Sequence, residues 1–237
     1  MKITEYVNTD IQWNPPILNC DVPISKDIKE PLPSTSHFMA FLGAAGSGKT
    51  SAAIAWLCNP EIYRKKYHHI HIVMPPNSRA SLEGNILKNH PPEKLHDDLT
   101  LQVLEFVQAY CETESSEKHY TLLFIDDCAA SLKNVEIQKL LQKLVFNRRH
   151  LRLSIWIMAQ SYNSLPLSLR KNISQAVIFR PRNKRELSTI FDELIYLNKD
   201  DQVKVANHVW DTPFNFLFID TAKGKLHKNF NLLTLED

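Results

Sequence analysis

The sequence predicts an α/β fold, with a mostly parallel central sheet and helices on both of its faces. Three observations lead to this prediction. Apolar runs of strand length alternate with amphipathic stretches of helix length along residues 37–237. A glycine-rich segment directly follows the first apolar run, and a pair of carboxylates ends the third. Sheets that are built from such alternating units are parallel and are buried between helices.

Each expected strand is an apolar or alternating run that stops at turn-forming residues. The expected strands are 38–42, 68–74, 120–125, 151–158 and 176–179, followed by a terminal hairpin of 214–219 and 225–230 joined through Lys223-Gly224. Apolar spacing predicts helices over 51–57, 99–110, 132–146, 166–172, 184–194 and 200–209, and a loop is expected over 77–92. Asn183 is expected to cap the fifth of these helices, with Glu186 three residues later.

Residues 1–36 differ from the rest of the chain. They contain five prolines and show no sustained periodicity. We expect an extended arm that packs on the body through Trp13 and Ile17, or alternatively a poorly ordered terminus. The expected organisation is therefore a Pro-rich arm, 1–36, and one domain, 37–237, that ends in the hairpin.

The composition is that of an ordinary soluble protein, with 43% hydrophobic and 23% charged residues. The four cysteines are far apart, so we expect reduced thiols in a cytosol-like compartment and propose no zinc site from them. The apolar runs are too short to span a membrane, and residues 1–5 lack the apolar core of a signal peptide. We expect an intracellular soluble protein.

The net charge of +2 is small, but its distribution is uneven. Residues 139–185 contain eleven Lys or Arg and no Asp or Glu, whereas residues 93–127 contain nine acidic residues and two lysines. The basic region fits a surface that contacts nucleic-acid phosphates. A solvated face that balances the acidic region of a neighbouring subunit is the alternative.

The glycine-rich segment, residues 43–50, fits G-x-x-x-x-G-K-[ST], the Walker A phosphate loop, and lies between an expected strand and an expected helix. Glycines let successive backbone N–H groups face a phosphate at the positive end of the helix. Lys49 supplies a charge for the β- and γ-phosphates, and the Thr50 hydroxyl can ligate Mg²⁺. The predicted ATP-binding residues are Gly43, Ala44, Ala45, Gly46, Ser47, Gly48, Lys49, Thr50 and Ser51.

The apolar strand 120–125 delivers Asp126 and Asp127 to the edge of the sheet, as the Walker B strand of an ATPase does. Asp126 can hold Mg²⁺ through water together with Thr50. Asp127 can accept a proton from the attacking water or orient it. Downstream of a complete phosphate loop, this pair predicts ATP hydrolysis.

Two further polar features of the sequence each allow two interpretations. Gln160 ends the strand 151–158, and it would lie beside the γ-phosphate if that strand inserts between the phosphate-loop strand and the acidic strand; alternatively it begins a turn. Three histidines occur in residues 68–71, where His69 and His71 share one strand face and His68 points away. We favour histidines without a metal, with a metal site as the alternative.

The motifs resemble those of the genome-packaging ATPases of large double-stranded DNA viruses, within the FtsK–HerA superfamily of DNA pumps. The resemblance covers about residues 37–230. The segments that carry it are 43–50, 122–127, 147–150 followed by 154–161, Leu165-Pro166 with Arg170 and Asn172, and 228–230. It implies a RecA-like P-loop NTPase fold with an extra strand between the phosphate-loop and acidic strands.

The resemblance also implies a homo-oligomeric ring of five or six subunits, with ATP between subunits and double-stranded DNA in the channel. An arginine of the neighbouring subunit would complete the site, and Arg149 is the first candidate and Arg148 the second. Arg149 as an ordinary surface charge is the alternative. Many members of the superfamily have Glu where this chain has Asp127, and the shorter aspartate side chain reaches less far as a direct base.

The leading hypothesis is an ATP-driven motor that packages double-stranded DNA into a viral capsid, with a capsid or portal-vertex protein as docking partner. It would act in the host cytoplasm or the viral factory, or be associated with the virion. The alternative is an assembly or loading factor on DNA that is switched by nucleotide without translocation. A small-molecule phosphotransferase would need a lid that the sequence does not clearly offer.

Overall fold

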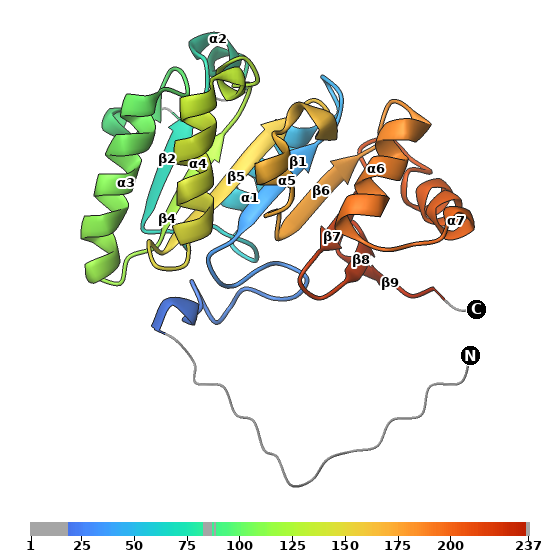
Figure 1. Ribbon diagram of the computed structural model, residues 1–237. Helices are drawn as coiled ribbons and strands as arrows, with labels where there is room; N and C mark the ends of the chain where they lie inside the picture. The colour runs from blue at the N-terminus through green and yellow to red at the C-terminus, as the bar shows by residue number, and fades with distance from the viewer. Residues whose placement is uncertain (1–18, 83–86, 88, 236–237) are drawn as a thin grey trace, which may run out of the picture.

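The computed structural model describes residues 19–82, 87 and 89–235, which form a single nine-stranded sheet flanked by helices (Figure 1). Trp13 and Ile17, the expected contacts of the arm, lie outside these residues. The strands are β1 (Phe38–Leu42), β2 (His69–Val73), β3 (Leu95–His96), β4 (Thr121–Ile125), β5 (Leu153–Ala159), β6 (Gln175–Phe179), β7 (Phe216–Asp220), β8 (Lys225–Lys228) and β9 (Asn231–Leu233).

The helices alternate with the strands along the chain, as the sequence predicts. They are α1 (Lys49–Cys58), α2 (Pro76–Ala80), α3 (Leu101–Ser116), α4 (Val135–Asn147), α5 (Leu167–Arg170), α6 (Lys184–Leu194) and α7 (Lys199–Val209). Short 3-10 helices cover Asn19–Asp21, Pro92–Lys94, Ser131–Lys133 and Tyr162–Ser164. Among the described helices, none combines the length and the hydrophobicity that a membrane crossing requires.

The strand order is β3-β2-β4-β5-β1-β6-β7-β8-β9. The first six strands in this order are parallel, and the last three add antiparallel pairs. Strand β5 lies between β1 and β4, so the predicted extra strand between the phosphate-loop and acidic strands is confirmed. Because the strands around β1 are parallel, the ends of β1, β4, β5 and β6 that carry polar residues meet at one edge of the sheet.

Two apolar clusters cover the two faces of the sheet. Alternate β1 side chains divide between them, with Ala40 on one face and Met39 and Phe41 on the other. The first cluster takes its helical residues from α3 to α7, and the second packs Ile54 and Trp56 of α1 against the sheet. Figure 1 shows the same division, with α3 to α6 in front of the sheet and α1 behind it.

Local chemistry sets the helix ends. Asn183 caps α6 as predicted, since its Oδ1 accepts a hydrogen bond from Glu186 N at 2.8 Å. The carboxylate of Glu186 does not return that bond to the cap and instead accepts one from Tyr162 N at 2.8 Å. Asn134 caps α4 in the same way, so the single helix expected over 132–146 divides into a 3-10 turn and α4.

The expected loop over 77–92 is wrong at its start, because α2 begins there with Pro76 in its first turn. In the segment before β1, Ile24 and Ile28 join the apolar cluster on the side of the sheet that α1 covers. Tyr63 Oη donates a hydrogen bond to Pro33 O at 2.9 Å, which fixes the last part of this segment before β1.

Candidate nucleotide-binding site

The loop between β1 and α1 has the backbone of a phosphate cradle. Gly48 lies immediately before α1 with φ of 98°, a left-handed conformation that suits glycine. A Cβ on Gly43 would lie 2.7 Å from Ser47 Oγ and 2.8 Å from Phe179 Cβ, so a side chain has no room there. The N–H groups of the first turn of α1 have no intrahelical partners and carry the positive end of the helix dipole.

Lys49 is folded back over this loop. Its Nζ donates hydrogen bonds to the backbone oxygens of Gly43 at 2.8 Å and Ala44 at 2.9 Å. Burial lowers the pKa of Lys49, while the charge of Asp126 acts in the opposite direction. The ammonium group therefore lies where phosphate oxygens could replace the two carbonyls as its acceptors.

Asp126 meets Thr50 across the site. The Thr50 hydroxyl donates to Asp126 Oδ2 at 2.5 Å, and Asp126 N donates to Val73 O at 2.9 Å. The side chain is buried, and this burial raises its pKa, with the neighbouring charge of Asp127 adding to the effect. A hydroxyl and a carboxylate in contact at the end of a buried strand match the oxygen ligands that Mg²⁺ prefers.

Asp127 is exposed and has a φ of 56°, which turns the chain sharply after β4. Its Oδ2 accepts a hydrogen bond at 2.9 Å from the hydroxyl of Ser78, which lies in α2. The second helix of the chain is thereby attached to the carboxylate that the sequence assigns to water activation.

These residues line one hollow of about 340 Å³. The sequence-predicted residues in its wall are Ala45, Gly46, Lys49, Thr50, Ser51, Asp126, Asp127 and Gln160. Gln160 follows β5, which pairs with β1 so that Leu42 and Ala159 are neighbours. The structure thus brings the exposed Gln160 amide to the same hollow as Lys49 and Asp126.

A second hollow, of about 410 Å³, opens on the other side of the loop. Gly46, Ser47, Trp210 and Phe214 are among the residues that line it. Phe214 is 70% exposed, although its ring reaches within 3.2 Å of the position of a Cβ on Gly48. An exposed aromatic face beside a phosphate loop can stack on a nucleotide base.

The structure does not bring the two arginine candidates to this site. Arg149 precedes β5 and lies at the opposite edge of the sheet from Gln160, separated by about 20 Å of strand. Its Nε donates to Asp21 Oδ1 at 2.7 Å, and Nη2 donates to the same oxygen. Arg148 is half-buried and donates to Val145 O at 2.8 Å, and burial lowers its pKa. Within one subunit, neither can reach the phosphates.

The basic region of the sequence divides in space. Arg148, Arg149 and Arg152 lie where β5 begins, whereas Arg180 and Arg182 follow β6 and lie near the phosphate loop. The positive charge of Arg182 is close enough to lower the pKa of Lys49. The eleven cations therefore do not form one continuous face.

Comparison with known proteins decides the family. The family described as the Poxvirus A32 protein matches residues 26–205. The chain belongs to this family. The A32-family chain is also 30% identical over 104 residues to uncharacterized protein 075L of Invertebrate iridescent virus 6. That match spans 43% of this chain and 40% of the relative, so it covers less than half the length of the curated relative.

Solved structures confirm the fold of this A32-family chain. The genome packaging NTPase B204 of Sulfolobus turreted icosahedral virus 2 in complex with ATP-gammaS superposes with a TM-score of 0.61 at 16% identity, covering 83% of this chain and 98% of B204. B204 of Sulfolobus turreted icosahedral virus, described as a DNA-packaging ATPase, gives 0.62 at 14% identity, with 85% and 98% covered. The secretion ATPase EccC of Thermomonospora curvata gives 0.54 at 11% identity, with 84% and 24% covered. The fold is RecA-like, and the predicted resemblance to packaging ATPases and FtsK-like proteins is confirmed at this level.

Three residues at the site were missed from the sequence. Ser78, Arg182 and Phe214 reach it from segments far from the motifs. The strand order places Arg182 there, because β6 lies beside β1 and ends at the same edge. Phe214 carried no signal in the sequence beyond its place at the start of an expected strand.

Proposed function

We propose that this chain hydrolyses ATP and uses the energy to move double-stranded DNA into a viral capsid. The observation that carries the proposal is the contact between Thr50 and Asp126 beside the Lys49-bearing loop. A lysine, a hydroxyl and a buried carboxylate at a helix N-terminus are the groups needed to hold a magnesium–nucleotide phosphate chain. The A32 family membership and the fold shared with the B204 packaging NTPases support the same proposal.

The residues present fit ATP and Mg²⁺. Ser47 Oγ is buried in the loop and has no hydrogen-bond partner among the described residues, so a phosphate oxygen would satisfy it. Thr50 and Asp126 would hold Mg²⁺, which supplies positive charge to the β- and γ-phosphate oxygens. The adenine base would lie in the second hollow with its face on the Phe214 ring.

The hydrolytic step would use the exposed groups around the first hollow. Asp127, held through one oxygen by Ser78, would orient the attacking water with its other oxygen. Gln160 would sense the γ-phosphate from the end of β5. Lys49 would neutralise charge that develops on the transferred phosphoryl group.

Part of the machinery would come from a neighbouring copy. We propose a ring of five or six subunits in which Arg149 of one subunit reaches the nucleotide of the next, with Arg148 as second candidate. Such an arginine can raise turnover by about 10³ to 10⁵. Basic side chains of region 139–185 would contact DNA in the channel, and a capsid or portal-vertex protein would dock the ring. The proposed place of action is the host cytoplasm, the viral factory or the virion.

The test measures ATP turnover by the full chain with and without linear double-stranded DNA, together with electron microscopy of the same samples. We expect DNA to stimulate hydrolysis and rings to surround it. Lys49→Ala should abolish turnover, whereas Lys204→Ala, which removes an exposed cation from α7 outside the region 139–185, should leave it within twofold. If correctly assembled rings hydrolysed ATP at the same rate with and without DNA, the proposal of a DNA-translocating motor would be refuted. Loss of assembly in Lys49→Ala would instead favour a nucleotide-switched assembly factor.

A further inference from the structure

A cluster of two imidazoles and one carboxylate lies outside the nucleotide site. Its members are His69 at the start of β2, Glu114 in the last turn of α3, and His119 just before β4. Their ligand atoms all lie within 4.8 Å of one another. His69 Nε2 is 2.8 Å and His119 Nδ1 is 2.6 Å from the same oxygen, Glu114 Oε2. From the sequence we favoured histidines without a metal at 68–71. The sequence did not predict that Glu114 and His119 lie beside His69.

The backbone builds this cluster independently of any ligand. Lys118 has a φ of 64°, and His119 N donates to Glu114 O at 3.1 Å, so the end of α3 is closed in a fixed turn. His69 N donates to Tyr120 O at 3.3 Å, which ties the start of β2 to the same turn. Three segments therefore present their side chains to one point.

The site has walls but is open to solvent. The side chains of His69, Glu114 and His119 are 18%, 22% and 39% exposed. The His68 ring stacks on that of His119 with centroids 4.5 Å apart, and the Tyr110 ring meets His69 edge-on at 5.2 Å. The ligand rings are thus held in place by aromatic neighbours while one side stays accessible to water.

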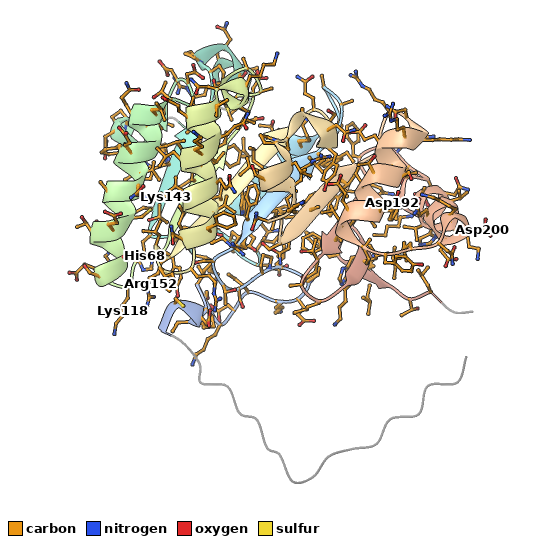
Figure 2. All side chains as sticks on the ribbon, viewed as in Figure 1. His68, Lys118, Lys143, Arg152, Asp192 and Asp200 are labelled. Atoms are coloured by element: carbon orange, nitrogen blue, oxygen red, sulfur yellow. The ribbon has the colours of Figure 1, made fainter. Side chains whose placement is uncertain are left out.

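The cluster is remote from ATP. His69 begins β2, whereas the other end of that strand, Val73, contacts Asp126 of the nucleotide site. Figure 2 shows the labelled neighbours His68 and Lys118 near Arg152, at the end of the sheet where β4 and β5 begin. A ligand bound here would act on the fold and not on the phosphates.

We propose that His69 Nε2, His119 Nδ1 and the Glu114 carboxylate bind a zinc ion, with water in the fourth position. Two imidazoles and one carboxylate are a set of three protein ligands that zinc takes, and nitrogen donors select it over Mg²⁺ and Ca²⁺. Zinc–ligand bonds of about 2.0–2.2 Å would replace the two hydrogen bonds to Glu114, after small outward rotations of the rings.

The charge of the site favours a cation at Glu114. Its hydrogen bond from His119 holds the pKa of this carboxyl below its usual range, and the contact with His69 adds to the effect. At neutral pH the cluster therefore offers one anionic oxygen ligand beside two imidazole nitrogens.

Lys94 is the feature that opposes a metal. Its Nζ lies 2.9 Å from His69 Nδ1 and 5.3 Å from the centre of the Tyr110 ring. Zinc on Nε2 would leave the proton of a neutral imidazole on Nδ1, which cannot accept a hydrogen bond from an ammonium group. Lys94 would have to turn toward solvent, so its removal should strengthen zinc binding.

The consequence for the fold is a clamp that joins β2, α3 and the turn before β4. Because the unfolded chain does not hold these three ligands together, zinc should bind the folded state preferentially and raise its melting temperature. The proposal does not rest on ATP hydrolysis, since its residues are separate from the phosphate loop.

The experiment titrates Zn²⁺ into the chelator-treated full chain by calorimetry, and records the absorption spectrum of the Co²⁺ form. We expect one strong site and a cobalt spectrum without a thiolate charge-transfer band, which excludes the exposed Cys58 as a ligand. Glu114→Gln and His119→Ala should each weaken binding at least tenfold, and Lys94→Ala should strengthen it severalfold.

His208→Ala, which removes an exposed imidazole from α7, is the matched control and should bind zinc like the parent chain. Circular dichroism without zinc checks that each variant is folded; Glu114→Gln keeps the shape of the side chain and its capacity for hydrogen bonds. A stoichiometric site that survives His119→Ala, a cobalt–thiolate spectrum, or the absence of a strong site would each overturn the proposal. An unchanged or weaker affinity in Lys94→Ala would overturn the assignment of His69 Nε2 as ligand.

Discussion

The buried carboxylate of Asp126 should make the protein less stable than it could be. Burial and the adjacent charge of Asp127 raise the pKa of Asp126 above its ordinary value of 3.8, so ionisation costs more in the folded than in the unfolded chain. Asp126→Asn removes this cost. The amide oxygen can still accept from Thr50.

The expected increase in the free energy of unfolding is about 0.5–2 kcal/mol, the usual range for a single stabilising substitution. For a chain of this size it corresponds to a rise of about 1–8 °C in melting temperature. The sign follows from proton linkage: a group whose pKa is raised in the folded state binds more protons folded than unfolded, so stability falls as pH rises through that pKa. The advantage of the variant should therefore be full at neutral pH and vanish in acid, where Asp126 is protonated in both states.

The assay is thermal unfolding of the nucleotide-free chain from acid to neutral pH, beside ATP turnover. Turnover of Asp126→Asn should fall by two orders of magnitude or more, because the loss of a charged metal ligand costs several kcal/mol. Glu105→Gln, an exposed carboxyl-to-amide change on α3, is the matched control and should alter stability by less than about 0.5 kcal/mol. A variant at Asp126 that is less stable at neutral pH, or whose advantage grows toward acid, would refute the reasoning.

Three other changes test the proposed site. Arg149→Ala should leave ATP binding intact and lower turnover sharply, and mixing it with Lys49→Ala subunits should restore part of the activity; no rescue in mixed rings would contradict action across subunits. Phe214→Ala should raise KM for ATP about five- to tenfold, from roughly 1 kcal/mol of lost stacking, while Phe214→Tyr keeps the parent value in the same kinetic assay. Ser78→Ala should lower kcat about fivefold at constant KM, since one hydrogen bond to a carboxylate is lost. Ser81→Ala, which removes a hydroxyl from the same wall, should change neither kcat nor KM. If Ser78→Ala kept the kcat of the parent chain, this would count against the role of Ser78.

Much of the fold can be predicted from local patterns. The run before Gly43 is apolar throughout, and the run before Asp126 is apolar from Leu122 on; both are strand-length. The glycine motif determines the loop and helix after the first of them. These segments form the same elements in almost any tertiary context, so the sequence predicts them well. Asn183 likewise caps α6 through a hydrogen bond between residues that are only three positions apart in the sequence.

The elements that the sequence missed depend on contacts over longer distances. Strand β3 is only two residues and exists through pairing with β2, and α2 is a single short helix after Pro75. The position of Ser78, the Phe214 ring and the convergence of Glu114 with His119 on β2 also depend on where distant segments pack. Residue type alone does not predict these contacts, because serine, phenylalanine and histidine have many unrelated roles.

We propose that Arg149 reaches the nucleotide of a neighbouring subunit. In the isolated subunit, Asp21 is its counterion. Asp21 offers that guanidinium a carboxylate oxygen, the same kind of acceptor as a phosphate. Exposed ion pairs of this kind contribute at most about 1 kcal/mol to stability. Replacing Asp21 by a phosphate as the partner of Arg149 therefore costs little free energy. The segment before β1 would then act as a competitor that keeps the arginine occupied until a second subunit, loaded with ATP, displaces it.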